Sequence, residues 1–339
     1  MSDLSDWSDR LEDLCLRLRL AVSDCLANSL ATGDEESVAR PVSTGAGDVT
    51  FGLDLPSEAV ATEWLQECAR ERPLSLLTED AGWRHMGPTK SSEGFASLEN
   101  FAHGGPRIAL DPIDGTRNLM ADLRSAWTVV SFAPAGEAMP RLNEITLGIV
   151  SELPISRMNR FLTLRAELGT GCVRTERGTE DNEVIREVRL DTGSDDRPDH
   201  GYFPFFRFER HQAPRIAAIE SEFHRRLAEH ESADTLTCYD DQYISNGGQL
   251  VLLTGGTYRF VSDLRAWLAS ESGKPATTSK PYDSAGAILC AREAGAILEA
   301  ADGSELDFPI DATTPVSFVG WVNAATRERL RPHFDAALR

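Results

Sequence analysis

The sequence predicts a mixed α/β protein, because helical and strand-like patterns alternate along the chain. Residues 4–30 place apolar side chains at spacings of three and four, which is typical of an amphipathic helix. Short apolar runs at 74–78, 127–133 and 145–151 have the length and composition of strands. A second helical pattern at 216–227 places helices in both halves of the chain.

Local signals predict the remaining elements. Asp54 precedes Pro56, which suits the first turn of a helix that continues to Cys68. Residues 184–190 alternate imperfectly and are flanked by charge runs, which indicates an edge strand. Residues 249–254 lie between two pairs of glycines and indicate a short helix with its C-terminal stop.

The length of the chain predicts two subdomains. A protein of 339 residues can bury a large core and commonly divides in this way. The best linker is the stretch at 191–199, which is rich in Asp and contains Gly and Pro. We therefore expect an N-terminal subdomain at 1–192 and a C-terminal subdomain at 193–339.

Composition excludes several classes of partner. The formal net charge is −20, which argues against nucleic acid or an anionic membrane as a partner.

The six cysteines are far apart and form no CxxC pair, so we expect buried thiols in a reducing compartment. The N-terminus lacks the apolar core of a signal peptide, and no apolar run approaches the length of a membrane span. We expect a cytoplasmic protein.

The most informative stretch reads Leu-Asp-Pro-Ile-Asp-Gly-Thr-Arg-Asn at residues 110–118. It follows a short apolar run that reads as a strand end. Asp111 and Asp114 lie three residues apart, and Pro112 biases Asp111 towards an extended conformation. Two carboxylates presented together at a strand end are suitable ligands for divalent cations.

Gly115 and Thr116 then offer a tight turn, whose backbone N–H groups a following helix would leave unpaired. Such N–H groups can hold a phosphate that the cations neutralise. The alternative is an ordinary structural turn, since Asp-Pro and Asp-Gly both favour turns. An EF-hand calcium loop does not fit, because counting from Asp111 puts Ile113 and Gly115 where oxygen side chains are needed.

Other acidic residues could join this motif. Glu79 and Asp80 directly follow the strand predicted at 74–78, and Asp283 opens a helical run whose small residues allow close packing. Alone, an acidic pair in a turn is usually solvated surface. Asp54 and Asp283 could likewise be ordinary helix caps.

These acidic stretches, in this order, resemble the signatures of the inositol monophosphatase family. That group of magnesium-dependent, lithium-sensitive phosphatases also includes fructose-1,6-bisphosphatases and phosphatases of 3′-phosphoadenosine nucleotides. The resemblance spans about residues 43–300 and is weakest at about 197–280, where substrate choice should lie. Asp48 and Asp54 keep the family's spacing, but the lysine often found in the preceding loop cannot be placed.

The resemblance implies layers of helices and sheets in the order α-β-α-β-α, with the active site between two subdomains. It also implies a homodimer and two Mg²⁺ ions, with room for a weaker third near Glu79 and Asp54. The implied metal ligands are Glu79, Asp111, the Ile113 carbonyl, Asp114 and Asp283. Asp80 is expected to contact these ligands rather than the metal ions themselves.

The implied reaction is hydrolysis of a small polyol or sugar phosphate by an activated water. Thr116, oriented by Asp54, and Glu79 take the catalytic roles, and the N–H groups of Gly115 and Thr116 hold the phosphate. Arg117 either contacts the leaving group or forms a surface salt bridge. Fructose 1,6-bisphosphate and 3′-phosphoadenosine nucleotides are alternative substrates, and a non-catalytic phosphate- or metal-binding relative is the alternative outside enzymes.

Overall fold

A nine-stranded sheet is the largest layer of the protein. The computed structural model describes residues 2–32, 38–44, 49–89, 94–231 and 237–339. The strands lie in the order β11-β10-β9-β8-β7-β6-β3-β4-β5. Their bounds are β3 Leu74–Thr78, β4 Gly82–Pro88, β5 Phe95–Ser97, β6 Arg107–Asp114, β7 Ala126–Ala133, β8 Leu147–Leu153, β9 Arg160–Glu167, β10 Gly171–Gly178 and β11 Val184–Leu190.

Neighbouring strands of this sheet run antiparallel, except that β3 and β6 are parallel. The predicted strand at 74–78 is confirmed with the same bounds, and β7 and β8 overlap the strands predicted at 127–133 and 145–151. β11 lies at one end of the strand order, so the predicted edge strand is also confirmed. β3 and β6 are neighbours, which brings the ends of the two acidic stretches side by side.

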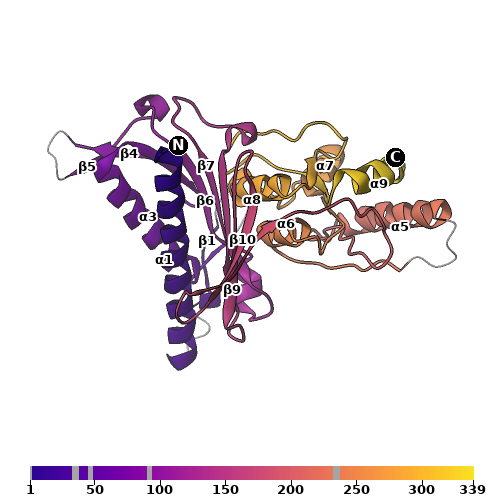
Figure 1. Ribbon diagram of the computed structural model, residues 1–339, viewed down its shortest axis with the longest axis horizontal. Coiled ribbons are helices and arrows are strands. Elements are labelled where there is room, and N and C mark those ends of the chain that lie inside the picture. Colours follow the sequence, from indigo (N-terminus) through magenta and orange to yellow (C-terminus); the bar gives the residue numbers. More distant parts are fainter. Residues whose placement is uncertain (1, 33–37, 45–48, 90–93, 232–236) are drawn as a thin grey trace.

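Two long helices, α1 (Ser2–Thr32) and α3 (Asp54–Glu71), cover one face of the nine-stranded sheet (Figure 1). Both match helices that the sequence predicted, at residues 4–30 and from Asp54 to Cys68. The indole rings of Trp7 and Trp64 pack together, and their cluster includes Ile108 of β6 and Phe132 of β7. Burial of these large side chains fixes α3, and with it Asp54, against the sheet.

The opposite face of the sheet carries α8 (Pro281–Glu293) and α6 (Asn246–Thr254) (Figure 1). Gly286 allows α8 to approach very closely, because a Cβ atom there would lie 2.0 Å from the Val130 carbonyl oxygen. A Cβ atom on Gly148 of β8 would in turn lie 2.3 Å from the Gly286 carbonyl oxygen. The small residues of α8 therefore allow the close packing that the sequence predicted.

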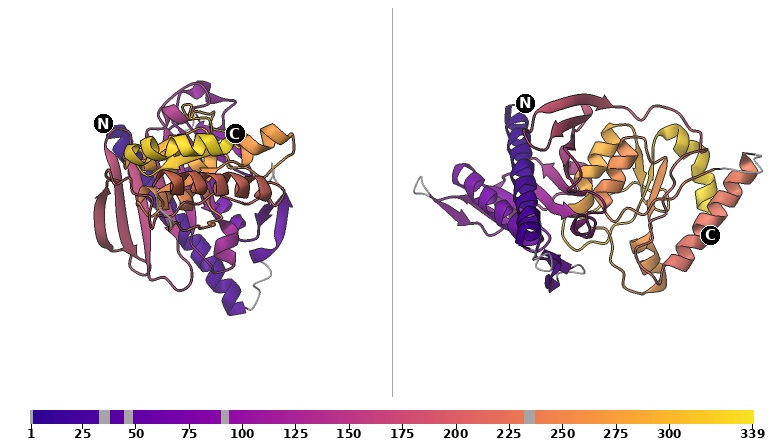
Figure 2. Two further views of the ribbon diagram at one scale, coloured as in Figure 1. Left: turned by 90° about the vertical axis from the view of Figure 1, so that its right-hand side faces the viewer. Right: turned by 90° about the horizontal axis from the view of Figure 1, so that it is seen from below.

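A second sheet of three strands lies beyond these helices, in the order β12-β14-β13. Its strands are β12 (Phe260–Asp263), β13 (Ile297–Glu299) and β14 (Phe318–Trp321). The outer helices are α5 (Ala213–His230), α7 (Arg265–Ser272) and α9 (Ala324–Leu338), as Figure 2 shows. Aromatic side chains of β12, β14, α5 and α9 form the core between this sheet and the outer helices. The predicted α-β-α-β-α layering is confirmed.

Short elements connect these layers. A two-stranded sheet pairs β1 (Pro41–Thr44) with β2 (Val49–Phe51), and α4 (Thr116–Met120) follows β6. Single turns of 3₁₀ helix are η1 (Phe101–His103) and η2 (Leu142–Glu144). All six cysteines are free thiols. Among the described residues, no helix is long and apolar enough to cross a membrane.

The subdomain boundary at 192/193 remains a prediction. The strands of the nine-stranded sheet end at Leu190, before this point. However, α8 lies far beyond it in sequence, and Ala285 and Ile288 share one core cluster with Val129 and Val150 of the large sheet. The two segments are thus joined by common packing.

Candidate active site

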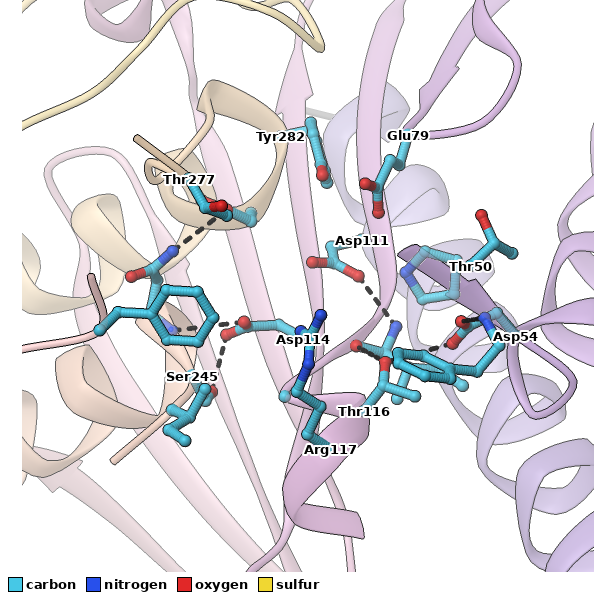
Figure 3. Close-up of a pocket in the computed structure, with 18 of the residues that line it drawn as sticks. Thr50, Asp54, Glu79, Asp111, Asp114, Thr116, Arg117, Ser245, Thr277 and Tyr282 are labelled. Atoms are coloured by element: carbon cyan, nitrogen blue, oxygen red, sulfur yellow. Dashed lines mark hydrogen bonds between the residues drawn. The ribbon is translucent and has the colours of Figure 1, made fainter. Parts of the chain in front are cut away.

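One pocket brings together the site residues that the sequence singled out (Figure 3). They come from α3, the end of β3, the end of β6, the start of α4 and the start of α8. The predicted residues that line this pocket are Asp54, Glu79, Asp80, Asp111, Ile113, Asp114, Gly115, Thr116 and Asp283. Asp48 lies outside the described residues.

The acidic motif lies within β6, whereas the sequence predicted that it follows the strand. β6 runs to Asp114, and its pairing with β7 shifts register between Asp111 and Asp114. Such a bulge accommodates Pro112, which has no N–H for a regular ladder. The Pro112 carbonyl accepts a hydrogen bond from the Thr128 hydroxyl at 2.9 Å. The irregular end of β6 places both aspartates in the pocket.

Gly115 ends the strand and begins α4. Its φ of 98° lies in the left-handed region, which glycine adopts without strain. The Thr116 hydroxyl oxygen then lies 3.2 Å from a carboxylate oxygen of Asp54 and 2.9 Å from the Ile113 carbonyl oxygen. Asp54, the first residue of α3, also accepts the Phe51 N–H at 2.7 Å. The predicted pairing of Thr116 with Asp54 is present in the geometry.

Glu79 and Asp80 differ in their environments. Glu79 is half-buried, and its carboxylate faces the Tyr282 hydroxyl at the start of α8 (Figure 3). Burial, followed by the negative charges of Glu79, Asp111 and Asp283, raises the pKa of Tyr282 well above its usual value. Asp80 is exposed and accepts the Thr50 hydroxyl at 2.8 Å.

Asp114 is held by the start of α6. Its carboxylate accepts hydrogen bonds from the Ser245 hydroxyl at 2.7 Å, the Gly247 N–H at 2.5 Å and the Asn246 N–H at 3.3 Å. Gly247 is needed for this approach, because a Cβ atom there would lie 2.9 Å from Asp114 Oδ2. The start of α6 thus packs directly on the acidic motif.

Asp283 is the third residue of α8, so it is not the N-cap that sequence reasoning offered as the alternative. Its carboxylate accepts the Lys280 N–H at 3.1 Å and the Ser279 hydroxyl at 3.0 Å. The Asn246 side-chain amide donates a third hydrogen bond at 3.1 Å. These contacts fix the carboxylate in the pocket, and Asp283 is only 8% exposed.

The clustered carboxylates favour protons when no cation is present. Burial raises the pKa of Asp111 well above its usual range, and the charges of Asp114, Glu79 and Asp283 add to the effect. Burial likewise raises the pKa of Asp114 to about 6, against the hydrogen bonds from Ser245 and α6. Burial and the charge of Asp114 raise the pKa of Asp283. A cation among these groups would favour their charged forms.

The donor set fits a hard divalent cation such as Mg²⁺. It consists of carboxylate oxygens and one backbone carbonyl, without sulfur or imidazole ligands. Within the described ranges, no three Asp, Glu, His or Cys side chains already surround a single point as metal ligands. The carboxylates share the pocket and interact through their charges.

Sequence reasoning missed several residues of the pocket. Glu58 lies one turn after Asp54 on α3, and burial raises its pKa. Phe206, Asn246 and Arg265 come from the C-terminal half and carry no recognisable motif. Only their place in the fold brings them to the site.

Arg117 lies at the pocket. Its guanidinium carbon is 5.3 Å from the ring centroid of Phe51 and 5.9 Å from that of Phe208, so it approaches side chains of both halves of the chain. Whether Arg117 contacts the leaving group or forms a surface salt bridge stays a prediction.

Comparison with known proteins gives matches in structure. No protein-family model and no curated protein sequence matches the chain. Fructose-1,6-bisphosphatase of Leishmania major aligns with a TM-score of 0.67 at 12% identity, covering 95% of this chain and 93% of that one. The extragenic suppressor protein of Bartonella henselae gives 0.61 at 12% identity, with 97% and 98% covered.

A third match is the inositol monophosphatase II of Staphylococcus aureus bound to 2′-AMP, with a TM-score of 0.57 at 13% identity and 98% and 97% covered. These likenesses extend over almost the whole length of each chain. They agree with the layered architecture. The chain therefore has the same fold as these inositol monophosphatase, fructose-1,6-bisphosphatase and suppressor-protein structures.

Proposed function

We propose that this protein is a Mg²⁺-dependent phosphomonoesterase that hydrolyses a small phosphorylated polyol or sugar. The observation that carries the proposal is the Thr116–Asp54 hydrogen bond beside the clustered carboxylates of Asp111, Asp114 and Asp283. A hydroxyl paired with a carboxylate can take a proton from water, and oxygen ligands for cations lie next to it. The fold, which is that of known phosphatases, supports the reaction class.

We assign one Mg²⁺ position to Glu79, Asp111 and the Ile113 carbonyl. The second position falls to Asp111, Asp114 and Asp283, and a weaker third would lie near Glu79 and Asp54. When bound, Mg²⁺ neutralises phosphate charge, lowers the pKa of water and stabilises the leaving oxygen.

The protein's own groups position the water and the phosphate. Thr116 accepts a hydrogen bond from the attacking water and donates its own hydrogen to Asp54, so that Asp54 receives the proton as the new P–O bond forms. The N–H groups of Gly115 and Thr116 hold phosphate oxygens. The bond to the leaving oxygen breaks in line with the attack, and the alkoxide takes a proton from solvent.

The aromatic residues of the pocket support a second candidate substrate, a nucleoside monophosphate. The Arg117 guanidinium lies close to the rings of Phe51 and Phe208, and the Phe206 ring stacks 6.2 Å from that of Phe208. Aromatic faces and guanidinium groups suit a flat base more than a polyol, which is usually bound through several hydrogen bonds.

A bisphosphate substrate has less support. It needs basic side chains for its second phosphate, and among the described residues of the pocket only Arg117 and Arg265 are basic. Arg265 is already paired with Asp263, with an N–O distance of 2.6 Å. We therefore rank fructose 1,6-bisphosphate below the polyol or sugar monophosphate and the nucleoside monophosphate as a candidate substrate.

A phosphate-release assay tests the proposal. The purified protein is incubated with inositol, sugar and nucleoside monophosphates, in excess chelator and then with excess Mg²⁺. We expect release that is absent in chelator and restored by Mg²⁺, with inhibition by millimolar lithium as a secondary readout. Release that is unaffected by chelator, or no release from any substrate, contradicts the proposal.

A further inference from the structure

A continuous chain of four polar side chains leads from the protein interior to Asp283. Asp263, at the end of β12, is fully buried and accepts hydrogen bonds from Arg265 Nε at 2.9 Å and Nη2 at 2.6 Å. Arg265 Nη2 also donates to Asn246 Oδ1 at 3.3 Å. Asn246 Nδ2 then donates to Asp283 Oδ2 at 3.1 Å. This series of hydrogen-bonded side chains runs from the three-stranded sheet to the first turn of α8.

The orientation of the Asn246 amide follows from its two neighbours. A guanidinium group can only donate hydrogen bonds, and a carboxylate only accepts them. The amide oxygen must therefore face Arg265, and the amide nitrogen must face Asp283. The opposite orientation would lose both hydrogen bonds.

Arg265 is itself held in place. Its Nη1 donates to the Thr277 carbonyl at 3.0 Å, and its guanidinium carbon lies 4.7 Å and 5.6 Å from the ring centroids of Phe206 and Phe208. The residue is 5% exposed. A planar guanidinium with a bidentate carboxylate and aromatic neighbours has little freedom to move.

Asn246 contacts two of the clustered carboxylates at once. Its side chain donates to Asp283, and its backbone N–H donates to Asp114 at 3.3 Å. The Ser245 hydroxyl and the Gly247 N–H, on either side of it, bond to Asp114 as well. The start of α6 therefore fixes Asp114, while Asn246 ties Asp283 to that same turn.

We propose that Asn246, held by the buried Asp263–Arg265 pair, is a positioning residue that sets the separation of Asp114 and Asp283 and so the affinity of the Mg²⁺ position they share. This inference rests on the proposed function for the identity of the cation. Partners that orient metal ligands commonly contribute 10- to 100-fold in metal affinity. The alternative is a buried polar network that stabilises the fold and has no effect on the cation.

Titration calorimetry of Mg²⁺ into the full-length, metal-free protein separates these readings without any turnover. We expect Asn246→Ala to weaken Mg²⁺ binding about 10-fold or more. The matched control is Gln249→Ala, which removes another buried amide of α6, one that donates to the Tyr243 carbonyl at 2.7 Å. Gln249→Ala should bind Mg²⁺ like the parent. Equal binding by the parent and Asn246→Ala, or equal weakening by both variants, overturns the proposal.

A second variant guards against misfolding. Replacing one member of the Asp263–Arg265 pair leaves a buried charge unpaired, whereas Asp263→Asn with Arg265→Met removes both charges at similar volume. This double variant should lose as much Mg²⁺ affinity as Asn246→Ala, and combining the two should add no further loss. Fully additive losses would show that Asn246 acts independently of the pair, and would overturn that part of the proposal.

The outcomes also separate this inference from the proposed function. A parent protein that binds Mg²⁺ but releases no phosphate contradicts the phosphatase, while the Asn246 and Gln249 titrations still decide the inference. A parent protein that binds no Mg²⁺ overturns both.

Discussion

The Thr116 hydroxyl oxygen lies 3.2 Å from a carboxylate oxygen of Asp54, which is 62 residues earlier in the chain. The same hydroxyl lies 2.9 Å from the Ile113 carbonyl, so two acceptors compete for one hydrogen. The contact joins the start of α4 to the start of α3. It is the clearest arrangement in the pocket for moving a proton.

Thr116→Val tests this arrangement, because valine keeps the shape of the side chain and lacks the hydroxyl. We expect kcat to fall about 100-fold or more, the usual range for loss of a proton-transferring group. Thr116→Ser keeps the hydroxyl and should retain most of the parental rate. Both variants are compared by steady-state kinetics on the best substrate at saturating Mg²⁺. A valine variant as fast as the serine variant would remove Thr116 from proton transfer.

The central part of the site could be predicted because it is local in sequence. Asp111, Asp114, Gly115 and Thr116 occur within six residues, and their types alone indicate cation and phosphate binding. Asp283 is distant in the chain, and nothing local links it to the others. It was placed at the site by family resemblance, and the structure brings it into the same pocket.

The remainder of the site depends on tertiary packing. Arg265 and Asn246 are polar residues in segments without a motif, and only the packing of α6 against β6 and β12 makes them neighbours of the carboxylates. Two strands of the fold could not be predicted either, because their local sequence pattern is weak. β10 carries charged and polar residues along most of its length, and β12 has only four residues, so neither gives a clear periodic signal.

Gly286→Ala tests whether close packing of α8 positions the site. The added Cβ atom would lie 2.0 Å from the Val130 carbonyl oxygen, so α8 must move away from the sheet. We expect a loss of about 1–3 kcal/mol in unfolding free energy, or more, together with lower activity. Denaturant unfolding measures the first effect. Gly255→Ala, whose Cβ atom would meet nothing closer than 3.4 Å, should change neither quantity appreciably.

Asp283→Asn separates cation binding from folding. Asparagine keeps one acceptor for the donors of Ser279, Lys280 and Asn246, and the loss of the other costs about 1 kcal/mol. Removing one charge from the cluster offsets this cost, since burial and Asp114 raise the pKa of Asp283. We expect the melting temperature in chelator to be unchanged or higher, and kcat to fall about 100-fold or more.

The same variant should also lose most of the rise in melting temperature that Mg²⁺ produces in the parent, because ligand binding stabilises the folded state. Asp9→Asn, a change at an exposed position of α1, serves as the charge-matched control and should keep that rise. A normal kcat for Asp283→Asn would exclude Asp283 from the site. A clearly lower melting temperature in chelator would instead attribute the damage to the fold.

Stability of the metal-free protein should depend on pH in an unusual direction. Asp114 has a pKa of about 6 in the folded protein, against an ordinary value of 3.8, chiefly because it is buried. The folded state therefore binds this proton more tightly than the unfolded state does. Stability from this group is fully present below pH 3.8 and is lost as the pH rises through about 6. The raised pKa values of Asp111 and Asp283 act in the same direction.

We therefore expect the melting temperature in chelator to be higher at pH 5 than at pH 7.5, with Asp114 contributing on the order of 1–3 kcal/mol. Saturating Mg²⁺ should flatten or reverse this trend, because a cation favours the ionised carboxylates and competes with their protons. Thermal unfolding across this pH range, with chelator and with Mg²⁺, measures both curves. A melting temperature that rises from pH 5 to 7.5 in chelator, with the same slope in Mg²⁺, would show that the pKa values of these carboxylates are not raised in the folded protein. That result would also remove the electrostatic reason for a cation at this place, independently of whether any substrate is hydrolysed.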